Sequence, residues 1–520
     1  MSQTLVSCPG KVLITGGYLV LDSGYTGIVL GTGSRFYTIV QSADSIPKTC
    51  SEIIIKVKSP QFLSANWNYS FKLSNQNQID LIMKPLDDQI ESSLNQNKFV
   101  ELALCESIKL SMALQKNHRC LFDQVTLNQS NQPQQTPYTL SVTILADNDF
   151  YSQPRHEKFK LPPFNQLHTT LNNVHKTGLG SSAAMVTSLC SAILLHLTPN
   201  LNRNEKNTKQ LLHNLAQYVH SMAQGKVGSG FDVSAAIWGT HLYRRFSPSC
   251  FDILLNANEA QISSEKLRLV LDPMINPTWS DAPTAPKVES FKIPKYTTLL
   301  LADVDAGSHT PSMVKKVLEW KNNQPESASR LWDKISKNNH QLRLTFEKLS
   351  DLEKQDEVGY LAQLTQLSQD SSPLVQQNDT SCPKAEDNAI SLFFKASSFM
   401  KLNRKLMKRM GNKANVPIEP DSQTRLLDEC QKLNGVIGCG VPGAGGYDAI
   451  WVLAFSTPDY QAEIFQGLLK LWESWPEVSV KGLSPDSWVI GGLDTKQGDG
   501  LRVLDSIDSV HGLREILEHA

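Results

Sequence analysis

The stretch KTGLGSSAAM at residues 176–185 joins two glycines and two serines directly to an apolar segment that is typical of a helix. Glycine permits positive φ angles, which let successive backbone N–H groups point inward, and a helix N-terminus adds the positive end of its dipole. Serine hydroxyls are hard oxygen donors of the kind that Mg²⁺ prefers. The stretch therefore predicts a phosphate cradle, although a capped helix after a flexible loop would use the same residues. It is not a Walker A loop, because no Gly-Lys-Ser/Thr closes it.

A second glycine-bearing stretch lies near the start of the chain, where residues 9–18 read PGKVLITGGY. It places Lys11 at the mouth of an apolar strand that ends in two glycines. An ammonium group there could neutralise a phosphate or the charge of a transition state. Taken alone, the stretch is also explained by a surface lysine before a hairpin.

A third stretch, GCGVPGAGGYD at residues 438–448, contains a literal GxGxxG. A dinucleotide-binding loop would lead into a helix, whereas this one leads into the apolar run 449–455, which reads as a strand. We therefore reject an NAD-dependent oxidoreductase. A glycine loop between strands favours close approach of backbone to a ligand, and a mobile hairpin is the alternative.

One further segment carries chemistry, QGKVGSGFD at residues 224–232. Asp232 follows a glycine-serine turn and precedes a run of small residues, which indicates a helix N-terminus. By itself this position favours an acid that caps the helix or complements its dipole.

Composition bounds the class of protein. The 520 residues are 40% hydrophobic, and 50 basic against 51 acidic residues leave a net charge of −1, so neither nucleic acid nor an anionic membrane is indicated as a partner. The nine cysteines form no CxxC pair, which favours reduced thiols over disulfides or zinc. No signal peptide, peroxisomal tripeptide or apolar run of membrane-spanning length is present, so we expect a soluble cytoplasmic protein.

Strand-like runs open the chain, at residues 11–15, 18–21, 28–30 and 35–40. Helical patterns cover residues 182–196, 208–224, 310–321, 327–349, 422–433 and 463–475. Polar stretches at 74–98, 128–136 and 368–388 are typical of surface insertions. Strands clustered at the start of each half predict an α+β fold, with domains at 1–272 and 287–520 joined by a proline-dotted linker at 273–286.

The stretches at 9–18, 176–185 and 438–448, in this order along the chain and at wide spacing, resemble the first, second and third motifs of the GHMP kinases. The resemblance implies an N-terminal α+β domain with a left-handed βαβ unit, a C-terminal ferredoxin-like domain, and an active site between them. It implies ATP and Mg²⁺ as cofactors and a monomer or homodimer acting on small molecules.

The resemblance also assigns roles to individual residues. ATP would be held by Lys176, Thr177, Gly178, Leu179, Gly180, Ser181, Ser182, Ala183, Ala184 and Met185. Lys11 and Asp232 would be catalytic, and Ser182 would ligate Mg²⁺. Mevalonate kinases carry a second, glutamate ligand at the position of Ser221, so the second protein ligand stays open here. The substrate would be contacted by Lys226, Ser229, Gly230, Gly307, Ser308, Gly443, Ala444, Gly445 and Gly446.

Variant positions narrow the resemblance to the eukaryotic phosphomevalonate kinases: Gly16-Gly17-Tyr18 in the first motif, and the segments 224–236 and 307–317. A phosphate acceptor is already mostly a dianion at pH 7, so Asp232 need not act as a base and could orient Lys11. Lys11 and Lys226 are the favoured cations for such an acceptor, ahead of Arg244 and Arg245. An alcohol acceptor such as mevalonate, or a catalytically silent ATP sensor, remains an alternative.

Two smaller expectations concern groups near these motifs. His309 is expected to be an ordinary surface histidine. The basic run Arg404, Lys405, Lys408 and Arg409 is expected to be a solvated helix face.

Overall fold

The computed structural model describes residues 2–42, 52–73, 79–84, 96–115, 137–153, 161–256, 262–279, 287–304, 310–369, 374, 388–492 and 500–519. The predicted insertions at 74–98, 128–136 and 368–388 lie largely outside these residues, as do Gly307, Ser308 and His309. None of the described helices combines the length and apolarity needed to cross a bilayer.

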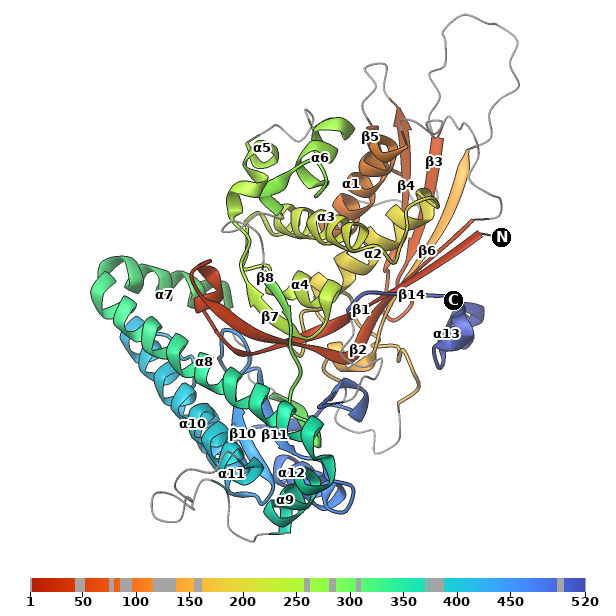
Figure 1. Ribbon diagram of the computed structural model, residues 1–520. Helices are drawn as coiled ribbons and strands as arrows, with labels where there is room; N and C mark the ends of the chain where they lie inside the picture. Colours follow the sequence, from red (N-terminus) through yellow and green to blue (C-terminus); the bar gives the residue numbers. More distant parts are fainter. Residues whose placement is uncertain are drawn as a thin grey trace, which may run out of the picture.

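A nine-stranded sheet forms the first half of the described structure, in the order β14-β1-β2-β6-β3-β4-β5, with β7 and β8 continuing from β2 (Figure 1). Its strands are β1 (Ser2–Thr15), β2 (Thr26–Ser42), β3 (Glu52–Lys58), β4 (Asn66–Leu73), β5 (Ile79–Lys84), β6 (Tyr138–Ala146), β7 (His241–Arg244), β8 (Lys287–Ser290) and β14 (Arg502–Leu504). Among the described strands, β3 and β6 pair in parallel, and the other pairs of this sheet are antiparallel.

Four helices cover one face of this sheet: α1 (Lys98–Leu114), α2 (Ser181–Leu197), α3 (Lys206–Gln224) and α4 (Phe231–Trp238) (Figure 1). The helix α2 is buried along nearly its whole length, because it packs on β1 and β2 and is itself covered by α1 and α3. The short helices α5 (Asp252–Leu255) and α6 (Ser264–Leu271) lie beyond α1. On the opposite face, Leu513 of α13 (Leu513–His519) packs against Leu5, Ile39 and Leu145.

The second half is built on an antiparallel sheet in the order β10-β11-β9-β12, with β13 also pairing with β9. Its strands are β9 (Thr297–Val304), β10 (Val436–Gly440), β11 (Ala449–Phe455), β12 (Val480–Gly482) and β13 (Val489–Ile490). Counted along the chain, β9 to β12 have the spatial order 4-1-3-2, with helices before β10 and before β12. This is the ferredoxin-like arrangement expected from the sequence.

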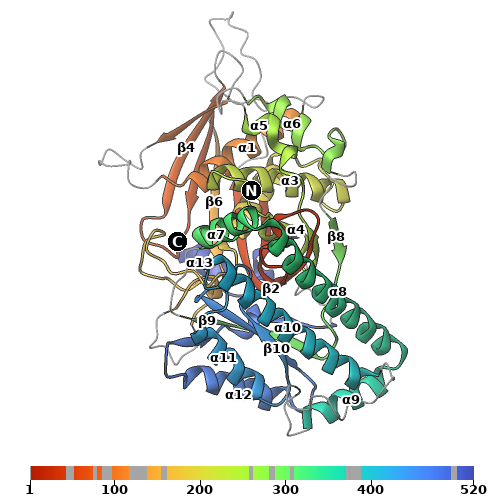
Figure 2. The same ribbon diagram turned by 90° about the vertical axis from the view of Figure 1, so that its left-hand side faces the viewer.

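Helices in this half are α7 (Thr310–Asn323), α8 (Pro325–Gln355), α9 (Glu357–Gln369), α10 (Ala389–Ala414), α11 (Asp421–Lys432) and α12 (Gln461–Glu473). The long helices α8 and α10 lie side by side, and α10 packs on β10 (Figure 2). Short 3₁₀ turns occupy Leu19–Leu21, Asn148–Phe150, Pro248–Phe251, Pro277–Trp279, Pro485–Ser487 and Ile507–Ser509.

Two details differ from the sequence-based expectations. Residues 18–21 are not a strand, because Tyr18 has a φ of 63° and starts the 3₁₀ turn Leu19–Leu21. The strand β8 lies beyond the predicted linker at 273–286, yet it pairs with β7 in the first sheet. The second sheet therefore begins only with β9, and β14 returns the chain to the first sheet after the second is complete.

Candidate active site

The phosphate-cradle stretch forms a loop with two left-handed glycines at the N-terminus of α2. Gly178 has a φ of 81° and Gly180 a φ of 80°, and Gly180 is the N-cap of the helix. The start of the loop is held to the preceding part of the chain, because the Thr177 hydroxyl donates to the Asp149 carbonyl at 2.5 Å. The exposed N-terminus of a helix that otherwise lies in the core is suited to hold an anion.

Lys11 joins the first motif to this loop. Its Nζ donates to the carbonyl oxygen of Gly178 at 2.7 Å, and its backbone N–H donates to that of Leu179 at 2.8 Å. A Cβ on Gly180 would meet Lys11 Cγ and Cε at 3.0 Å. Desolvation lowers the pKa of Lys11 below its ordinary value, and the carboxylate of Asp232 opposes that shift. The structure thus brings the predicted cation onto the predicted cradle.

Ser182 contacts a histidine that the sequence did not single out. His220 Nε2 lies 3.1 Å from Ser182 Oγ and 3.1 Å from the amide nitrogen of Gln224. Burial lowers the pKa of His220 below its usual value, against the opposing field of Asp232, so the imidazole is neutral at pH 7. The next residue, Ser221, stands out in the sequence because it replaces a glutamate of the mevalonate kinases. His220 lies in no motif, so no pattern in the sequence indicated a role for it.

Asp232 lies in the first turn of α4, where its Oδ1 accepts a hydrogen bond from the Val233 N–H at 3.0 Å. This contact agrees with the helix-terminus interpretation of the sequence. Lys11 Nζ lies 5.5 Å from the ring centroid of Phe231, the residue before Asp232. The charge of Asp232 raises the pKa values of both Lys11 and His220 against the effect of burial.

The turn that precedes α4 is fixed by neighbouring side chains. Arg245 donates to the carbonyls of Val227 and Gly228 at 3.1 and 2.6 Å, and to that of Leu21 at 2.8 Å. Tyr243 Oη donates to the Ser229 carbonyl at 2.5 Å. Arg245 therefore holds backbone rather than pointing a free charge at an acceptor, whereas Lys226, on the same turn, is exposed.

The C-terminal glycine loop meets the first motif directly. The Gly443 N–H donates to the Leu13 carbonyl at 3.1 Å, and Tyr18 Oη donates to the Ala444 carbonyl at 2.7 Å. A Cβ on Gly17 would lie 2.4 Å from the Gly443 oxygen, so only glycine permits this approach. The mobile-hairpin alternative is wrong, because the loop is bonded across the two halves of the molecule.

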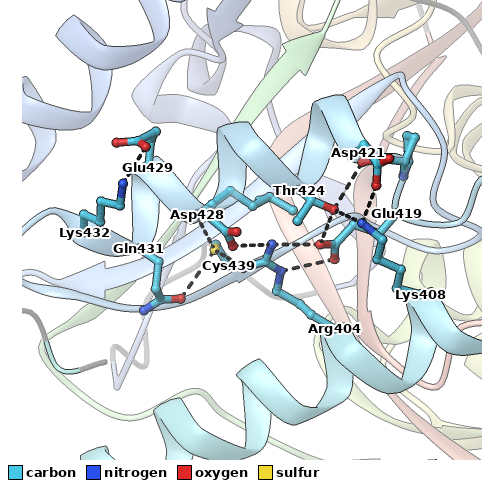
Figure 3. Close-up of polar contacts among 12 residues, drawn as sticks. Arg404, Lys408, Glu419, Asp421, Thr424, Asp428, Glu429, Gln431, Lys432 and Cys439 are labelled. Carbon is cyan, nitrogen blue, oxygen red and sulfur yellow. Dashed lines mark hydrogen bonds and ion pairs between the residues drawn. The ribbon is translucent and has the colours of Figure 1, made fainter. Parts of the chain in front are cut away.

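One expectation about this region is also wrong. Arg404 is not part of a solvated helix face: its side chain is only 10% exposed and pairs with Glu419, which is 3% exposed (Figure 3). Lys405 and Arg409 are exposed, as expected. A basic run therefore contained one arginine that faces the protein, which periodicity alone did not reveal.

The donor set fits a magnesium–nucleotide site better than a cage made only of protein ligands. Among the described residues, no three His, Cys, Asp or Glu side chains are grouped so that they could hold a metal ion. The Ser182 hydroxyl, 3.1 Å from His220 Nε2, and the Asp232 carboxylate, whose charge acts on the pKa of His220, are hard oxygens. Mg²⁺ bound with phosphates uses only one or two protein oxygens. A cradle, an anchored lysine and such oxygens suit phosphoryl transfer between small molecules.

Comparison with known proteins agrees with this chemistry. Residues 153–240 match the family described as the GHMP kinases N terminal domain. The chain is 34% identical over 502 residues to the phosphomevalonate kinase of Aspergillus fumigatus, covering 91% of each chain. It is 34% identical over 482 residues to the peroxisomal phosphomevalonate kinase of Arabidopsis thaliana, covering 86% of this chain and 89% of that one.

The fold is shared with a solved structure of the Streptococcus pneumoniae phosphomevalonate kinase in complex with phosphomevalonate and AMPPNP. The TM-score is 0.53 at 14% identity, with 97% of this chain and 100% of the other covered. The chain belongs to the GHMP kinase family, and within it to the group formed by the fungal and plant phosphomevalonate kinases. The predicted fold class is thereby confirmed.

Proposed function

We propose that this protein transfers the γ-phosphoryl group of ATP to the phosphate of 5-phosphomevalonate, giving ADP and 5-diphosphomevalonate. The observation that carries the proposal is the similarity to kinases of that name over nine-tenths of the chain. The approach of Lys11 to the loop at 176–185 supports it independently, because the two come from distant parts of the sequence and meet at 2.7 Å.

In this reaction an oxygen of the acceptor phosphate forms a bond to the γ-phosphorus, while the bond between that phosphorus and the bridging oxygen of ADP breaks. The acceptor needs no deprotonation when it is a dianion, so the main barrier is repulsion between two anions. Lys11 reduces that repulsion at the cradle. Asp232 orients Lys11 through its charge and is not required as a base.

The loop from Lys176 to Met185 would bind the ATP phosphates through its N–H groups, and Ser182 would hold Mg²⁺. When bound with the nucleotide, the metal ion neutralises charge on the phosphates. His220 keeps the Ser182 hydroxyl in place. Lys226, Ser229 and Gly230 would face the acceptor from the turn before α4.

From the other half of the molecule, the backbone from Gly443 to Gly446 would close over the acceptor. Gly307 and Ser308, outside the described residues, are proposed to contribute hydrogen bonds. We further propose a monomer or homodimer in the cytoplasm, in keeping with the free thiols of the described cysteines.

The test is an ADP-release assay with ATP, Mg²⁺ and 5-phosphomevalonate, with mevalonate in a parallel reaction. Turnover on phosphomevalonate alone is expected. Turnover on mevalonate alone would move the enzyme to the alcohol kinases and restore Asp232 as a base, and nucleotide binding without turnover on either would favour a sensor. We expect Asp232→Asn to lower kcat by less than the roughly 10⁴-fold upper range of a general base. Near-total loss with unchanged binding and fold would contradict the orienting role.

A further inference from the structure

The pair formed by Arg404 and Glu419 is a two-point ion pair enclosed by protein. Arg404 Nη2 lies 2.7 Å from Glu419 Oε1, and Arg404 Nε lies 3.1 Å from Glu419 Oε2 (Figure 3). Asp428 of α11 adds a contact at 3.0 Å from the outer side. A guanidinium fork on a carboxylate fixes orientation as well as distance, which a single ammonium contact does not.

The backbone of Ile418, the residue before Glu419, supports one end of the glycine loop. The Ile418 carbonyl accepts the Gly446 N–H at 2.9 Å, and a Cβ on Gly445 would lie 2.1 Å from the same oxygen. The loop therefore rests on the backbone immediately before Glu419. Gly445 and Gly446 are thus packed one residue away from the Arg404–Glu419 pair.

The same arginine also reaches the strand that leads into the loop. Its Nη1 lies 3.7 Å from the sulfur of Cys439, which is fully buried in β10. Arg404 thus contacts the strand before the loop directly, and it pairs with Glu419, which follows the Ile418 backbone that holds Gly446. Figure 3 shows the guanidinium between these two parts of the chain.

The pair also lies directly behind the seam between the two halves of the molecule. Arg404 and Glu419 line a small cavity of about 20 Å³ together with Leu13, Gly17 and Gly443. The Gly443 N–H bonds to the Leu13 carbonyl, and Leu13 lies on β1 two residues beyond Lys11. The ion pair and the first motif therefore line one cavity, together with the glycine loop.

We propose that Arg404 and Glu419 are positioning residues, which set the glycine loop against the first motif so that the loop closes over the acceptor. They act through the loop and do not touch a substrate themselves. The kinetic part of this inference rests on the proposed function; the structural part does not. A merely structural pair would change the stability of the protein without altering the loop selectively.

The experiment compares Glu419→Gln and Arg404→Lys with a matched control, Glu477→Gln. Glu477 forms a similar two-point pair with Arg425 of α11, at 2.6 and 2.7 Å, but this pair lies on the surface. Within the described structure, neither side chain hydrogen-bonds to Leu13, Tyr18 or Ile418, the residues that hold the loop. Backbone hydrogen exchange over residues 440–447 is measured in each variant, together with kcat, the KM for both substrates and the thermal midpoint.

For Glu419→Gln we expect faster exchange at Gly443 and Gly446 and a fall in kcat of about tenfold or more, since small misplacements of positioning groups are costly. Arg404→Lys should lie between the parent and Glu419→Gln, because lysine keeps the charge but loses the fork. The control should change neither quantity. If Glu419→Gln does not fold, Arg404→Lys decides by the same two readouts.

Exchange that matches the control in a folded variant overturns the inference, whatever the acceptor. A loss of thermal stability with kcat unchanged overturns it as well. Selectively faster exchange in a protein whose parent has no turnover on phosphomevalonate supports the role in loop positioning and refutes the proposed reaction instead.

Discussion

At the scale of single residues, the cradle depends on two glycines that share one backbone conformation but not one environment. Gly178 and Gly180 have φ angles of 81° and 80°, and a Cβ on Gly178 would meet nothing within 4 Å, whereas one on Gly180 would press on Lys11. The first glycine is needed for its backbone conformation alone, whereas the second also leaves space for the Lys11 side chain.

Alanine at these two positions should therefore have unequal costs. Gly178→Ala should lower the free energy of unfolding by about 1–2 kcal/mol, the penalty of a left-handed conformation for an L-residue. Gly180→Ala should cost roughly a further 1 kcal/mol or more, because Lys11 must shift. Urea unfolding without ligand measures both. Equal losses of unfolding free energy in the two variants would show that the Lys11 side chain can move aside without an energetic penalty.

A residue of the candidate site could be predicted from the sequence only where the residues next to it in the chain form a recognisable pattern. Lys11, Ser182 and Asp232 each stand in a short glycine-bearing stretch whose backbone chemistry is readable. His220 and Arg404 do not: each lies within a helix whose exposed and buried faces are set by distant partners, Ser182 for one and Glu419 for the other. Their roles become visible only when those partners are placed.

At the scale of elements, the turn before α4 is positioned from the strand β7 that follows the helix. Arg245 stands directly after β7 and bonds three carbonyls, two in the turn and one at Leu21. A partly buried guanidinium that bonds to these carbonyls restrains a segment of backbone that is not held by the hydrogen bonds of a helix or a sheet. The turn carries Lys226 and leads into Asp232.

Arg245→Met should release this turn and lower kcat by about tenfold, as expected when residues that orient a catalytic group lose their support. Arg244→Met removes the same charge one position earlier and serves as control. Proteolytic cleavage or hydrogen exchange at residues 225–230 should increase only in the first variant. Equal behaviour of the two would mean that net charge, not the carbonyl contacts, matters.

Elements with a strong local period were predicted closely. The strand predicted at 449–455 is β11 (Ala449–Phe455), and the helices predicted at 182–196 and 208–224 extend by only one or two residues as α2 and α3. The basic run at 404–409 was expected on a helix face, but the extent of α10 was not predicted, although Asn388 caps it by accepting the Ser391 N–H at 2.8 Å. Its start adjoins a polar stretch, which obscured the cap.

At the scale of the whole molecule, stability should depend on histidines that are buried as neutral rings. Burial lowers the pKa of His196, His213 and His241 to about 4 from the ordinary 6.5. Between these values the unfolded chain binds protons that the folded protein does not, so the free energy of unfolding falls as pH falls from 6.5. Asp147, whose pKa burial raises to about 7, contributes in the opposite direction.

His213→Gln should therefore flatten the pH dependence. Between pH 7 and pH 5 the variant should lose about 1–2 kcal/mol less unfolding free energy than the parent, the contribution of one such group by linkage. The substitution of the exposed His340 by Gln is the control. Urea unfolding at the two pH values measures the difference, and parallel losses in both variants would contradict the assignment to His213.

The overall architecture was predictable from the order of three motifs, but the path between the two sheets was not. Composition placed the linker at a proline-dotted segment, whereas β8 continues the first sheet beyond it and β14 rejoins that sheet near the end of the chain. Pairings between strands so distant in sequence depend on which edge of the sheet remains unpaired, and no local sequence pattern indicates which edge that is.

The return of β14 has a consequence for how the protein is made. Leu5, Val6 and Ser7 of β1 pair with Leu504, Val503 and Arg502, so this strand pairs with a partner that is synthesised nearly 500 residues later (504 − 5 = 499 for the first pair). At roughly 5–20 residues per second, that edge waits on the order of 25 to 100 seconds during synthesis. An open strand edge invites wrong pairing. A newly made chain should therefore be most vulnerable to aggregation, and most dependent on chaperones, before translation reaches residue 504.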